Sequence, residues 1–406
     1  MKRVALLCVG LAVGVASAAE AQLTMQMTNG WSFTFSGNVN AFAIYESQDE
    51  GGGTLAAPGG LIGIGGKGFS IRTGLLPAFA VFDAKGKEGN TDLGVHFGFA
   101  PQIQCGGQAH DCFGAQIDMR QVYLTVGGTW GQILAGREIG LFNRQNILTD
   151  QTLFGIGATG GINGGGTTLG RIGFGYIYPN FVAQMTYSTP AGKPGQLSIG
   201  LFQPSSLNSD AGTAYDETQV PRLEAEGTYK TGDFLLWANG TLQNAKNTAL
   251  DETKTATGVG GGIRIGKSTF SLTGSGYFGK GIGTTLQFNG VNGCDPTLGC
   301  GPVQGIGVGA DGELRDSYGY IGQLTFTPSN SKVTIAGSYG SSFLKATDGE
   351  PDFKTENTLI SGGIYYQATK SLKVVGEGNY AWTKESVADT DKNTTFAPAF
   401  GLMLFF

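Results

Sequence analysis

Apolar and polar residues alternate along most of the second half of the chain. From 223 to 229 every second residue is apolar or small, a polar turn occupies 230–233, and the alternation resumes from 234 to 242. Successive side chains of a β-strand point to opposite faces, so a period of two predicts strands rather than helices. The pattern therefore predicts a hairpin in which one face of each strand is apolar.

This unit of strand, short turn, strand and long polar loop recurs toward the end of the chain. Further strands are predicted over 259–265, 270–278, 318–326, 333–339, 360–366 and 372–382. Their opposite faces carry the polar side chains Glu224, Glu226, Asn239, Thr241, Arg264, Thr273, Gln323, Thr325, Thr334, Glu377 and Asn379. A soluble sandwich also alternates, but short turns that alternate strictly with long loops are typical of a transmembrane β-barrel with a polar lumen.

The final segment of the sequence fits the closing strand of such a barrel. Counting back by twos, one face carries Phe406, Leu404, Leu402, Phe400 and Phe396. Only Pro398 breaks the pattern. Soluble proteins seldom expose an apolar edge strand, whereas a barrel pairs its last strand with its first.

The first half of the chain is less regular. Strands are predicted near 31–46, 69–84, 91–101, 116–127, 130–137 and 196–203, together with one long strand from Arg171 to Ser188 that is broken near Pro179. The sequence thus predicts an all-β, antiparallel transmembrane barrel of about 16 strands, an even number as in other barrels of this kind. A barrel of about 18 strands is the alternative.

The N-terminus has the three parts of a secretory signal peptide. A basic start precedes an apolar run over 4–15, and an Ala-Glu-Ala motif follows at 19–21. We predict a signal peptide over 1–21 and the mature barrel over 22–406, with cleavage after Ala18 as the alternative. No other stretch approaches the length of a transmembrane helix.

Composition narrows the class of partner. The formal net charge is −5 and no basic block occurs, which argues against a nucleic-acid partner. Glycine is abundant, with 71 of 406 residues, but it falls inside the alternating patterns, which disordered segments do not show.

Four cysteines of the expected mature chain form two close pairs. They are Cys105, Cys112, Cys294 and Cys300. Paired cysteines in an exported protein predict disulfides, here one within each of two loops. A metal site is the alternative, but His110 is the only histidine nearby, and we predict neither a metal nor a cofactor.

The loop after the fifth predicted strand, about 138–168, is long and unusually apolar. An apolar loop favours burial, which the lumen of a barrel of this size offers. Folded inward, the loop would narrow the pore and carry Asp150 and Glu138 into the constriction. On the opposing wall we expect arginines of the second, fourth and sixth strands, namely Arg72, Arg120 and Arg171. Cations that face acids across a narrow gap sort ions and orient polar solutes; the alternative is that these arginines lie near the headgroups.

Three segments resemble Gram-negative general porins. The run from Met119 to Arg137 resembles their segment R-x-A-Y-V-G-L followed by F-G-x-x-x-x-G-R, and residues 172–181 resemble their sixth strand. The C-terminal signal read by the outer-membrane barrel-assembly machinery is matched by Gly401, Leu404 and Phe406. Ala399 stands where that signal has a polar residue.

The resemblance covers essentially the mature chain. It implies a homotrimeric diffusion channel in the outer membrane of a Gram-negative bacterium, in contact with membrane lipid and lipopolysaccharide. It also implies that Asp150, on a third loop folded into the lumen, faces the arginine cluster of the wall. The loop lacks the acidic, glycine-rich motif of the enterobacterial members and holds one central acid.

Three functions compete. A porin for passive diffusion of ions and small hydrophilic solutes needs no catalytic residue. A substrate-specific porin for a sugar, an organic acid or an anion would need a ladder of lumenal aromatics or excess lysine, and only Trp237 and Tyr365 fall on the inward register. A barrel enzyme needs a histidine-centred site, and only His96 and His110 occur, so we expect a channel and not an enzyme.

Overall fold

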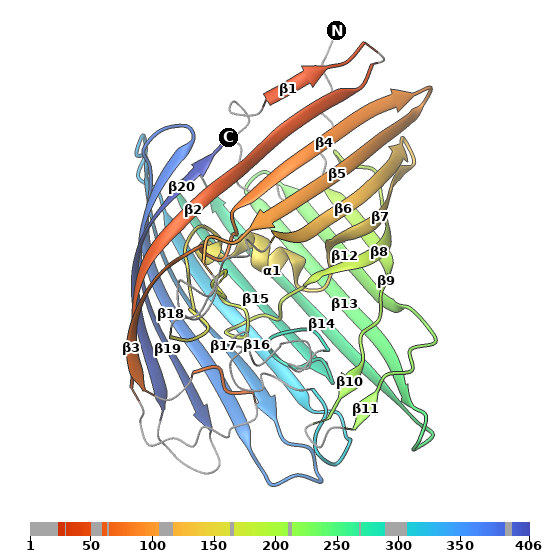
Figure 1. Ribbon diagram of the computed structural model, residues 1–406, viewed down its shortest axis with the longest axis vertical. Coiled ribbons are helices and arrows are strands. Elements are labelled where there is room, and N and C mark those ends of the chain that lie inside the picture. Colours follow the sequence, from red (N-terminus) through yellow and green to blue (C-terminus); the bar gives the residue numbers. More distant parts are fainter. Residues whose placement is uncertain are drawn as a thin grey trace.

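The computed structural model describes residues 23–28, 30–49, 59–62, 65–104, 117–162, 166–209, 213–267, 269–288, 307–385 and 392–406. One antiparallel sheet dominates it and closes on itself into a barrel (Figure 1). None of the helices in these ranges is long and apolar enough to cross a membrane.

The sheet is built from strands that follow one another around the wall. In chain order they are β2 (Ser32–Asp49), β3 (Gly66–Arg72), β4 (Phe79–Glu88), β5 (Thr91–Pro101), β6 (Ile117–Gly128), β7 (Gly131–Ile139), β8 (Phe181–Ser188), β9 (Gly195–Phe202), β12 (Arg222–Thr231), β13 (Phe234–Asn247), β14 (Glu252–Lys267), β15 (Phe270–Lys280), β16 (Asp316–Phe326), β17 (Val333–Lys345), β18 (Lys354–Gln367), β19 (Leu372–Glu385) and β20 (Asn393–Phe405). The remaining elements are β1 (Leu23–Gln26), β10 (Leu207–Asn208), β11 (Ala214–Tyr215), α1 (Arg144–Thr149) and the 3-10 helix η2 (Gln151–Phe154).

Two of these strands, β3 and β4, together occupy one strand position of the barrel wall. β3 pairs with β2 over Phe42–Gln48, and β4 pairs with the same edge over Ser32–Asn38. The strand expected near 69–84 is therefore real but interrupted between Arg72 and Phe79. Short β1 continues the line of β20 along the other edge of β2. Counted in this way, the wall has 16 strands, as the sequence predicted.

The two ends of the chain meet where the barrel closes. Phe406 and Gly37 exchange two backbone hydrogen bonds of 2.9 and 3.0 Å, and the ring of Phe406 lies 5.2 Å from that of Phe35. A Cβ on Gly37 would lie 2.3 Å from the carbonyl oxygen of Phe79, so only glycine fits this crossing. The prediction that the last strand pairs with the first is confirmed.

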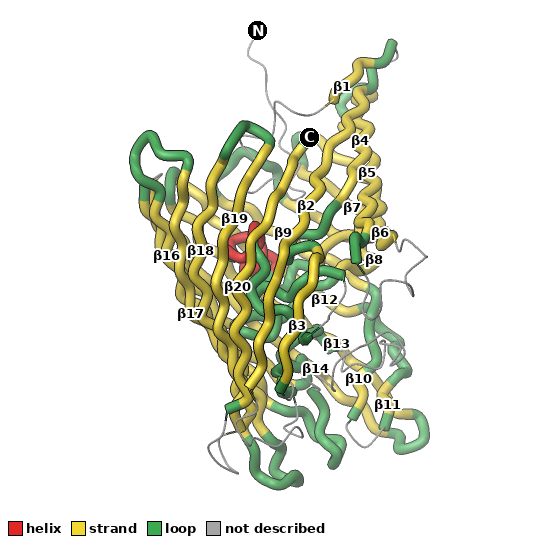
Figure 2. The backbone as a smooth tube through the Cα atoms, turned by 60° about the vertical axis from the view of Figure 1, so that its left-hand side comes forward, coloured by secondary structure: helices red, strands yellow, loops and turns green. Residues whose placement is uncertain are grey.

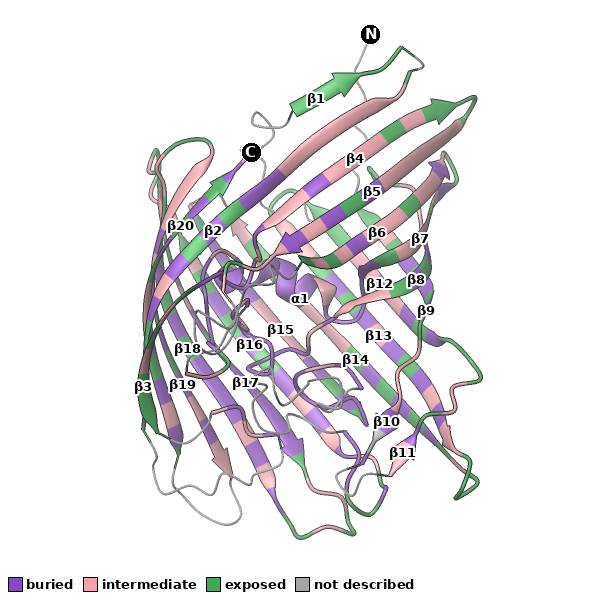
Figure 3. Cartoon of the chain, viewed as in Figure 1, coloured by how far each residue is buried: buried purple, intermediate pink, exposed green. Residues whose placement is uncertain are grey.

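Inward and outward faces differ as the alternation predicted. Figure 3 shows exposed and buried residues in turn along the strands. On β13, outward Leu236 is 46% exposed and inward Trp237 is 2% exposed. The polar side chains of Glu226, Asn239 and Gln323 are likewise buried on the inside. The wall therefore presents an apolar band outward and polar groups inward.

Short turns and the C-terminus lie at one end of the barrel, and long loops lie at the other (Figure 2). In a transmembrane barrel the short turns face the periplasm and the long loops face the exterior. One external connection is shorter than expected. The sequence pattern predicted strands only up to 242 and again from 259, but the connection spans just 248–251, because the hydrogen-bonded ladder of β13 and β14 continues to Asn247 and Glu252.

The strand predicted from Arg171 to Ser188 is wrong in its first half. Only β8, from Phe181, joins the wall, and the preceding residues lie inside the barrel. Pro179 lacks a backbone N–H for a ladder, and Asn180 has a φ of 58°, in the left-handed region. Two glycines with positive φ, Gly173 and Gly175, bend the chain further upstream.

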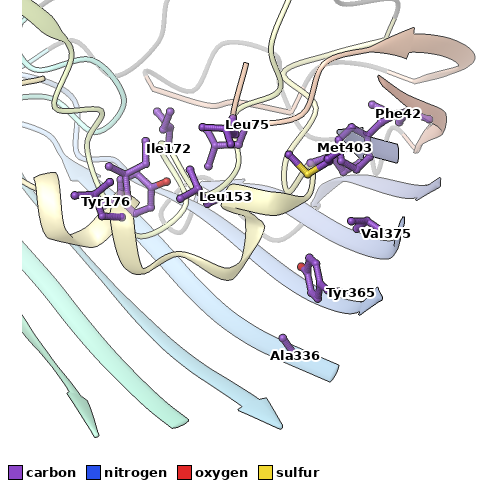
Figure 4. Close-up of a cluster of buried hydrophobic side chains, with 14 of the residues drawn as sticks. Phe42, Leu75, Leu153, Ile172, Tyr176, Ala336, Tyr365, Val375 and Met403 are labelled. Carbon is purple, nitrogen blue, oxygen red and sulfur yellow. The ribbon is translucent and has the colours of Figure 1, made fainter. Parts of the chain in front are cut away.

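A hydrophobic core fills part of the lumen (Figure 4). Leu153 and Ile172, from the segment between β7 and β8, pack with Phe42 of β2, Tyr365 of β18 and Met403 of β20. Burial of these apolar side chains explains why the segment between β7 and β8 lies inside the barrel and not on its external surface. The apolar composition of the predicted loop is thus matched by a packed interior.

Candidate pore constriction

The described residues between β7 and β8, 140–162 and 166–180, run through the interior of the barrel, where α1 is visible in Figure 1. We call this segment the inner loop. Its described residues are almost all buried or half-buried. The predicted lumenal third loop is confirmed, although it extends to 180 instead of about 168.

Glutamates of β12 hold the first part of the inner loop. The Glu224 carboxylate accepts hydrogen bonds from the backbone N–H groups of Leu141 and Phe142, at 2.7 and 3.0 Å. Glu226 accepts from the side chains of Arg144 and Gln145, each with a contact of 3.2 Å. These contacts satisfy backbone and side-chain donors that would otherwise be buried without a partner.

β13 and β16 hold the two short helices. Trp237 of β13 donates from Nε1 to the Asn146 side chain of α1 at 2.8 Å. Gln323 of β16 donates to the carbonyl of Thr149 at 3.0 Å and accepts from the N–H of Gln151 at 2.7 Å. The link between α1 and η2 is therefore fixed to the wall from two directions.

Glu377 of β19 holds the next turn of the inner loop. Its Oε1 accepts from the N–H groups of Ile156 and Gly157, at 3.0 and 2.7 Å, and its Oε2 accepts from the Tyr365 hydroxyl at 2.8 Å. A Cβ on Gly155 would lie 1.8 Å from Oε2. The glycine at 155 therefore permits the backbone to approach the carboxylate closely.

Asp150 and Arg171 are brought together within the inner loop. Asp150 accepts from the N–H of Thr152 and from the hydroxyl of Tyr176, both at 2.9 Å. Burial raises the pKa of the Asp150 carboxyl, and the nearby Arg171 guanidinium opposes that rise. Arg171 itself is fully buried and donates to the Ser338 hydroxyl and the carbonyl of Leu359.

Arg171 therefore does not lie on a wall strand, which corrects the prediction of its position. The alternation of Tyr176 and Tyr178 with smaller residues imitates a strand, but these side chains pack inside the barrel. The acid and this arginine share one loop instead of facing each other from loop and wall.

Arg72 lies on β3 of the wall, as predicted for the second strand. It is 3% exposed and donates to the carbonyl oxygens of Gly166 and Thr167 in the inner loop, with Nε–O at 3.3 Å and Nη2–O at 2.5 Å. Arg72 thus holds the far part of the loop.

Glu138 and Arg120 have separate partners near the start of the inner loop. Glu138 is buried and accepts from the Gln121 amide at 2.8 Å. Arg120 donates to Asp118 at 2.7 Å and lies 5.8 Å from the ring centre of Phe181. The side chains of Arg120 and Asp118 are 19% and 41% exposed, so this pair reaches solvent.

Sequence reasoning missed the anchoring residues. Glu224, Glu226 and Glu377 were recognised as inward polar residues, but nothing in the alternation separates an anchor from any other lumenal side chain. An anchoring role could be recognised from sequence only by one signal: an inward carboxylate in a barrel whose lumen also holds an apolar loop, because the backbone N–H groups of that loop need acceptors. Trp237 and Tyr365 do lie on the inward register, as predicted.

The other predicted chemical groups divide into two sets. Cys105, Cys112, Cys294, Cys300 and His110 lie outside the described residues, as does the predicted signal peptide. His96 lies 2.9 Å from Asp83 and stacks on Tyr123 at 4.6 Å. Among the described residues no group of three or more metal-ligating side chains gathers.

A buried ion pair joins two external loops above the lumen. Arg315 precedes β16 and donates from Nε to Glu350, in the loop 346–353, at 2.9 Å. Glu350 also accepts from the N–H groups of Ala310 and Thr347, at 2.9 and 3.1 Å. Burial alone would raise the pKa of Glu350, but these donors lower it to about 2.

We expect this pair to make the external loops acid-sensitive. The ordinary pKa is 4.5 and the folded pKa about 2, so its stabilisation is fully present above about pH 4.5 and is lost as pH falls through about 2. Pepsin should therefore cleave loop 346–353 slowly at pH 4.5 and quickly near pH 2, and Glu350→Gln should be cleaved quickly at both. Glu313→Gln is the control, because that side chain is 64% exposed. Equal cleavage of wild type and Glu350→Gln at pH 4.5 would contradict the prediction.

The closed antiparallel wall, the apolar outer band and the polar lumen with a folded-in loop define an outer-membrane β-barrel channel. A model of the Gram-negative porin family matches residues 5–386. The chain belongs to the Gram-negative porin family. It is an outer-membrane channel for passive diffusion of small solutes and not an enzyme.

Solved structures agree on the fold. The outer membrane channel DcaP of Acinetobacter baumannii has a TM-score of 0.65 at 16% identity, covering 94% of this chain and 99% of its own. An anion-selective porin from Comamonas acidovorans has a TM-score of 0.62 at 13% identity, covering 93% of this chain and 100% of its own. OmpF of Salmonella typhi, in complex with daunomycin, has a TM-score of 0.59 at 11% identity, covering 94% of this chain and 100% of its own. No curated protein matches the sequence.

Proposed function

We propose that the inner loop forms the constriction of the channel and that Asp150, Glu138, Arg72, Arg120 and Arg171 determine its shape and charge. The observation that carries this proposal is the set of wall contacts along the loop, from Glu224 of β12 to Glu377 of β19. Four of the five residues are buried and act by positioning the loop. Arg120 reaches solvent and acts on permeating ions directly.

Passive diffusion of ions and small hydrophilic solutes is favoured over a sugar-specific channel. A sugar channel needs aromatic faces that are open to the lumen. Trp237 is 2% exposed and bound to Asn146, and Tyr365 is 7% exposed and bound to Glu377. Both aromatics are therefore occupied with anchoring the inner loop.

We further propose a homotrimer that uses the outward face of the wall from β2 to β7. Ala41 and Ala43 are small residues on that face. Arg137 of β7 is exposed beside Val122 and Ala183, on the same side as Ile133. An arginine at the lipid midplane costs about 2–4 kcal/mol, so this face suits contact with protein. A related fold, OmpT of Vibrio cholerae, is described in a trimer form.

Two further contacts belong to the same proposal. The outward apolar band contacts membrane lipid and lipopolysaccharide. Gly401, Leu404 and Phe406 form the signal for the barrel-assembly machinery, before Phe406 takes its place beside Phe35 in the closed barrel. Residues 1–21 are proposed as the signal peptide and 22–406 as the mature channel.

Planar-bilayer recording of the refolded mature chain tests the constriction. We expect long-lived channel openings that arrive in steps of three. Asp150→Asn should shift the reversal potential in the direction of anion selectivity, because it removes the one acid of the inner loop, which lies near Arg171. Arg120→Gln should shift it toward cations. Glu385→Gln, at the external end of β19, serves as the control for a distant charge change. Unchanged selectivity in both constriction variants, with normal folding, would reject the proposed constriction.

A further inference from the structure

His96 is a buried histidine that has no role in the constriction described above. It lies on the inward face of β5, is 8% exposed, and is the cross-strand neighbour of Asp83 on β4. Its Nδ1 lies 2.9 Å from the Asp83 carboxylate, and its ring stacks on Tyr123 of β6 with 4.6 Å between ring centres and 7° between planes. Because an ionised carboxylate only accepts hydrogen bonds, Nδ1 carries a proton and Nε2 is the atom that titrates.

The Nε2 atom of His96 is buried and has no hydrogen-bond partner among the described residues. It borders the space above Gly98, where a Cβ would lie 3.4 Å from Nε2 and 3.0 Å from the Oε1 atom of Gln121. The glycine therefore leaves the imidazole nitrogen and the amide oxygen beside the same small space. When His96 is neutral both atoms are acceptors, so neither satisfies the other, whereas in the protonated ring Nε2 becomes a donor.

The orientation of the Gln121 amide is fixed by Glu138 of β7. Its Nε2 donates to both carboxylate oxygens, at 3.1 and 2.8 Å, which leaves its oxygen for His96. The same carboxylate accepts from the backbone N–H of Ile139 at 2.6 Å, directly before the inner loop. We call Asp83, His96, Gln121 and Glu138 the His96 relay. Its contacts are continuous except between His96 and Gln121.

Charged groups of several elements surround the relay. Its titratable and charged side chains and their neighbours are Asp83 and Lys85 of β4, Arg120 and Tyr123 of β6, Glu138 of β7 and Arg144 of α1. Two of them are carboxylates at the ends of the relay, and Glu138 is close enough to interact electrostatically with His96. A protonated His96 would therefore lie between two anions.

We propose that His96 is a positioning residue that, when protonated, fastens the base of the inner loop to the wall. Protonation at Nε2 adds the one donor that the relay lacks, and the new hydrogen bond to Gln121 holds the Glu138 carboxylate against the N–H of Ile139. Loss of that proton leaves two acceptors beside each other and frees Gln121 to move. The inference rests on the proposed role of the inner loop as the constriction. It predicts a channel whose current becomes noisier as the pH rises from about 5 to 8.

Solution NMR of the folded mature channel tests the relay itself. The chain has two histidines, so His110→Asn leaves His96 as the one imidazole signal. We expect that signal to titrate between about pH 5 and 8. Hydrogen exchange of the Ile139 amide, corrected for its intrinsic pH dependence, should be roughly tenfold slower when His96 is protonated, because a hydrogen bond to a charged group is gained. Open-channel current noise in planar bilayers should rise over the same pH interval, in wild type and in His110→Asn alike.

Two variants break the relay at and beyond the titrating nitrogen. His96→Phe keeps an aromatic ring on Tyr123 but has no proton to gain, so exchange at Ile139 and current noise should stay at their high-pH values throughout. Gln121→Met should preserve the titration of His96 and abolish its effect on Ile139. A merely structural role for His96 does not predict that separation.

The outcomes separate the relay from the wider proposal. A pH step that survives in His96→Phe would assign the step to carboxylates such as Glu138 and overturn the relay. An imidazole that stays neutral down to about pH 5, or one that titrates without any step at Ile139, would reject it equally. A step at Ile139 with no step in current noise would support the relay and reject the inner loop as the constriction. Heat-modified migration of each variant checks that the barrel is folded.

Discussion

Replacing Glu377 by alanine should release the inner loop from β19 and widen the channel. The change removes one buried carboxylate that accepts from Ile156, Gly157 and Tyr365. A hydrogen bond to a charged group contributes about 1.5–3 kcal/mol, so losing several of them costs the docked loop several kcal/mol. We expect higher and noisier single-channel conductance, and faster liposome swelling with larger sugars.

Two controls define this result. Glu385→Ala removes a glutamate from the external end of the same strand and should leave conductance near that of wild type. Gly155→Ala approaches the same site from the loop side, since its added methyl would clash with the Glu377 carboxylate at 1.8 Å. It should reproduce the Glu377→Ala conductance. A Glu377→Ala channel that matches wild type in conductance and in sugar exclusion would show that the loop does not depend on this anchor.

The wall was predictable from sequence because each strand obeys a local rule. An outward side chain faces an apolar environment and the next side chain faces the polar lumen. Apolar and polar residues therefore alternate along β13, and a few residues are enough to reveal the strand. Burial of the third loop was predictable for a related reason. The apolar residues of 138–154 have no place on an external surface, and the lumen is the nearest interior.

The contacts that fix the inner loop were not predictable. Glu377 meets Ile156 across 221 positions of sequence, and Glu224 meets Leu141 across 83. No local pattern encodes pairs at such separations. The error at 171–180 has the same origin, because residues that pack against a lumenal core alternate much as residues of a strand do. Only the three-dimensional arrangement shows that Arg171 belongs to the loop.

Replacing Arg171 by methionine should destabilise the inner loop more than any other single charge change in the lumen. Arg171 is fully buried, holds Ser338 and Leu359, and lies near the carboxylates of Asp150 and Glu377. Without Arg171 these carboxylates stay buried beside no compensating cation, and leaving a buried charge uncompensated costs about 3–5 kcal/mol. We expect amide hydrogen exchange in the range 171–180 to accelerate strongly while the wall strands stay protected.

A double-mutant cycle distinguishes charge compensation from packing. If the uncompensated Asp150 carboxylate causes the loss, adding Asp150→Asn to Arg171→Met should restore part of the exchange protection, whereas Asp150→Asn alone should weaken it. Arg264→Met is the matched control, because Arg264 is exposed on the inward register of β14, opposite Leu235 and Thr273. Additive effects of the two changes would assign the role of Arg171 to its contacts with Ser338 and Leu359. A positive coupling would instead show that the acid and the arginine stabilise the loop as a pair, which then sets the width of the pore.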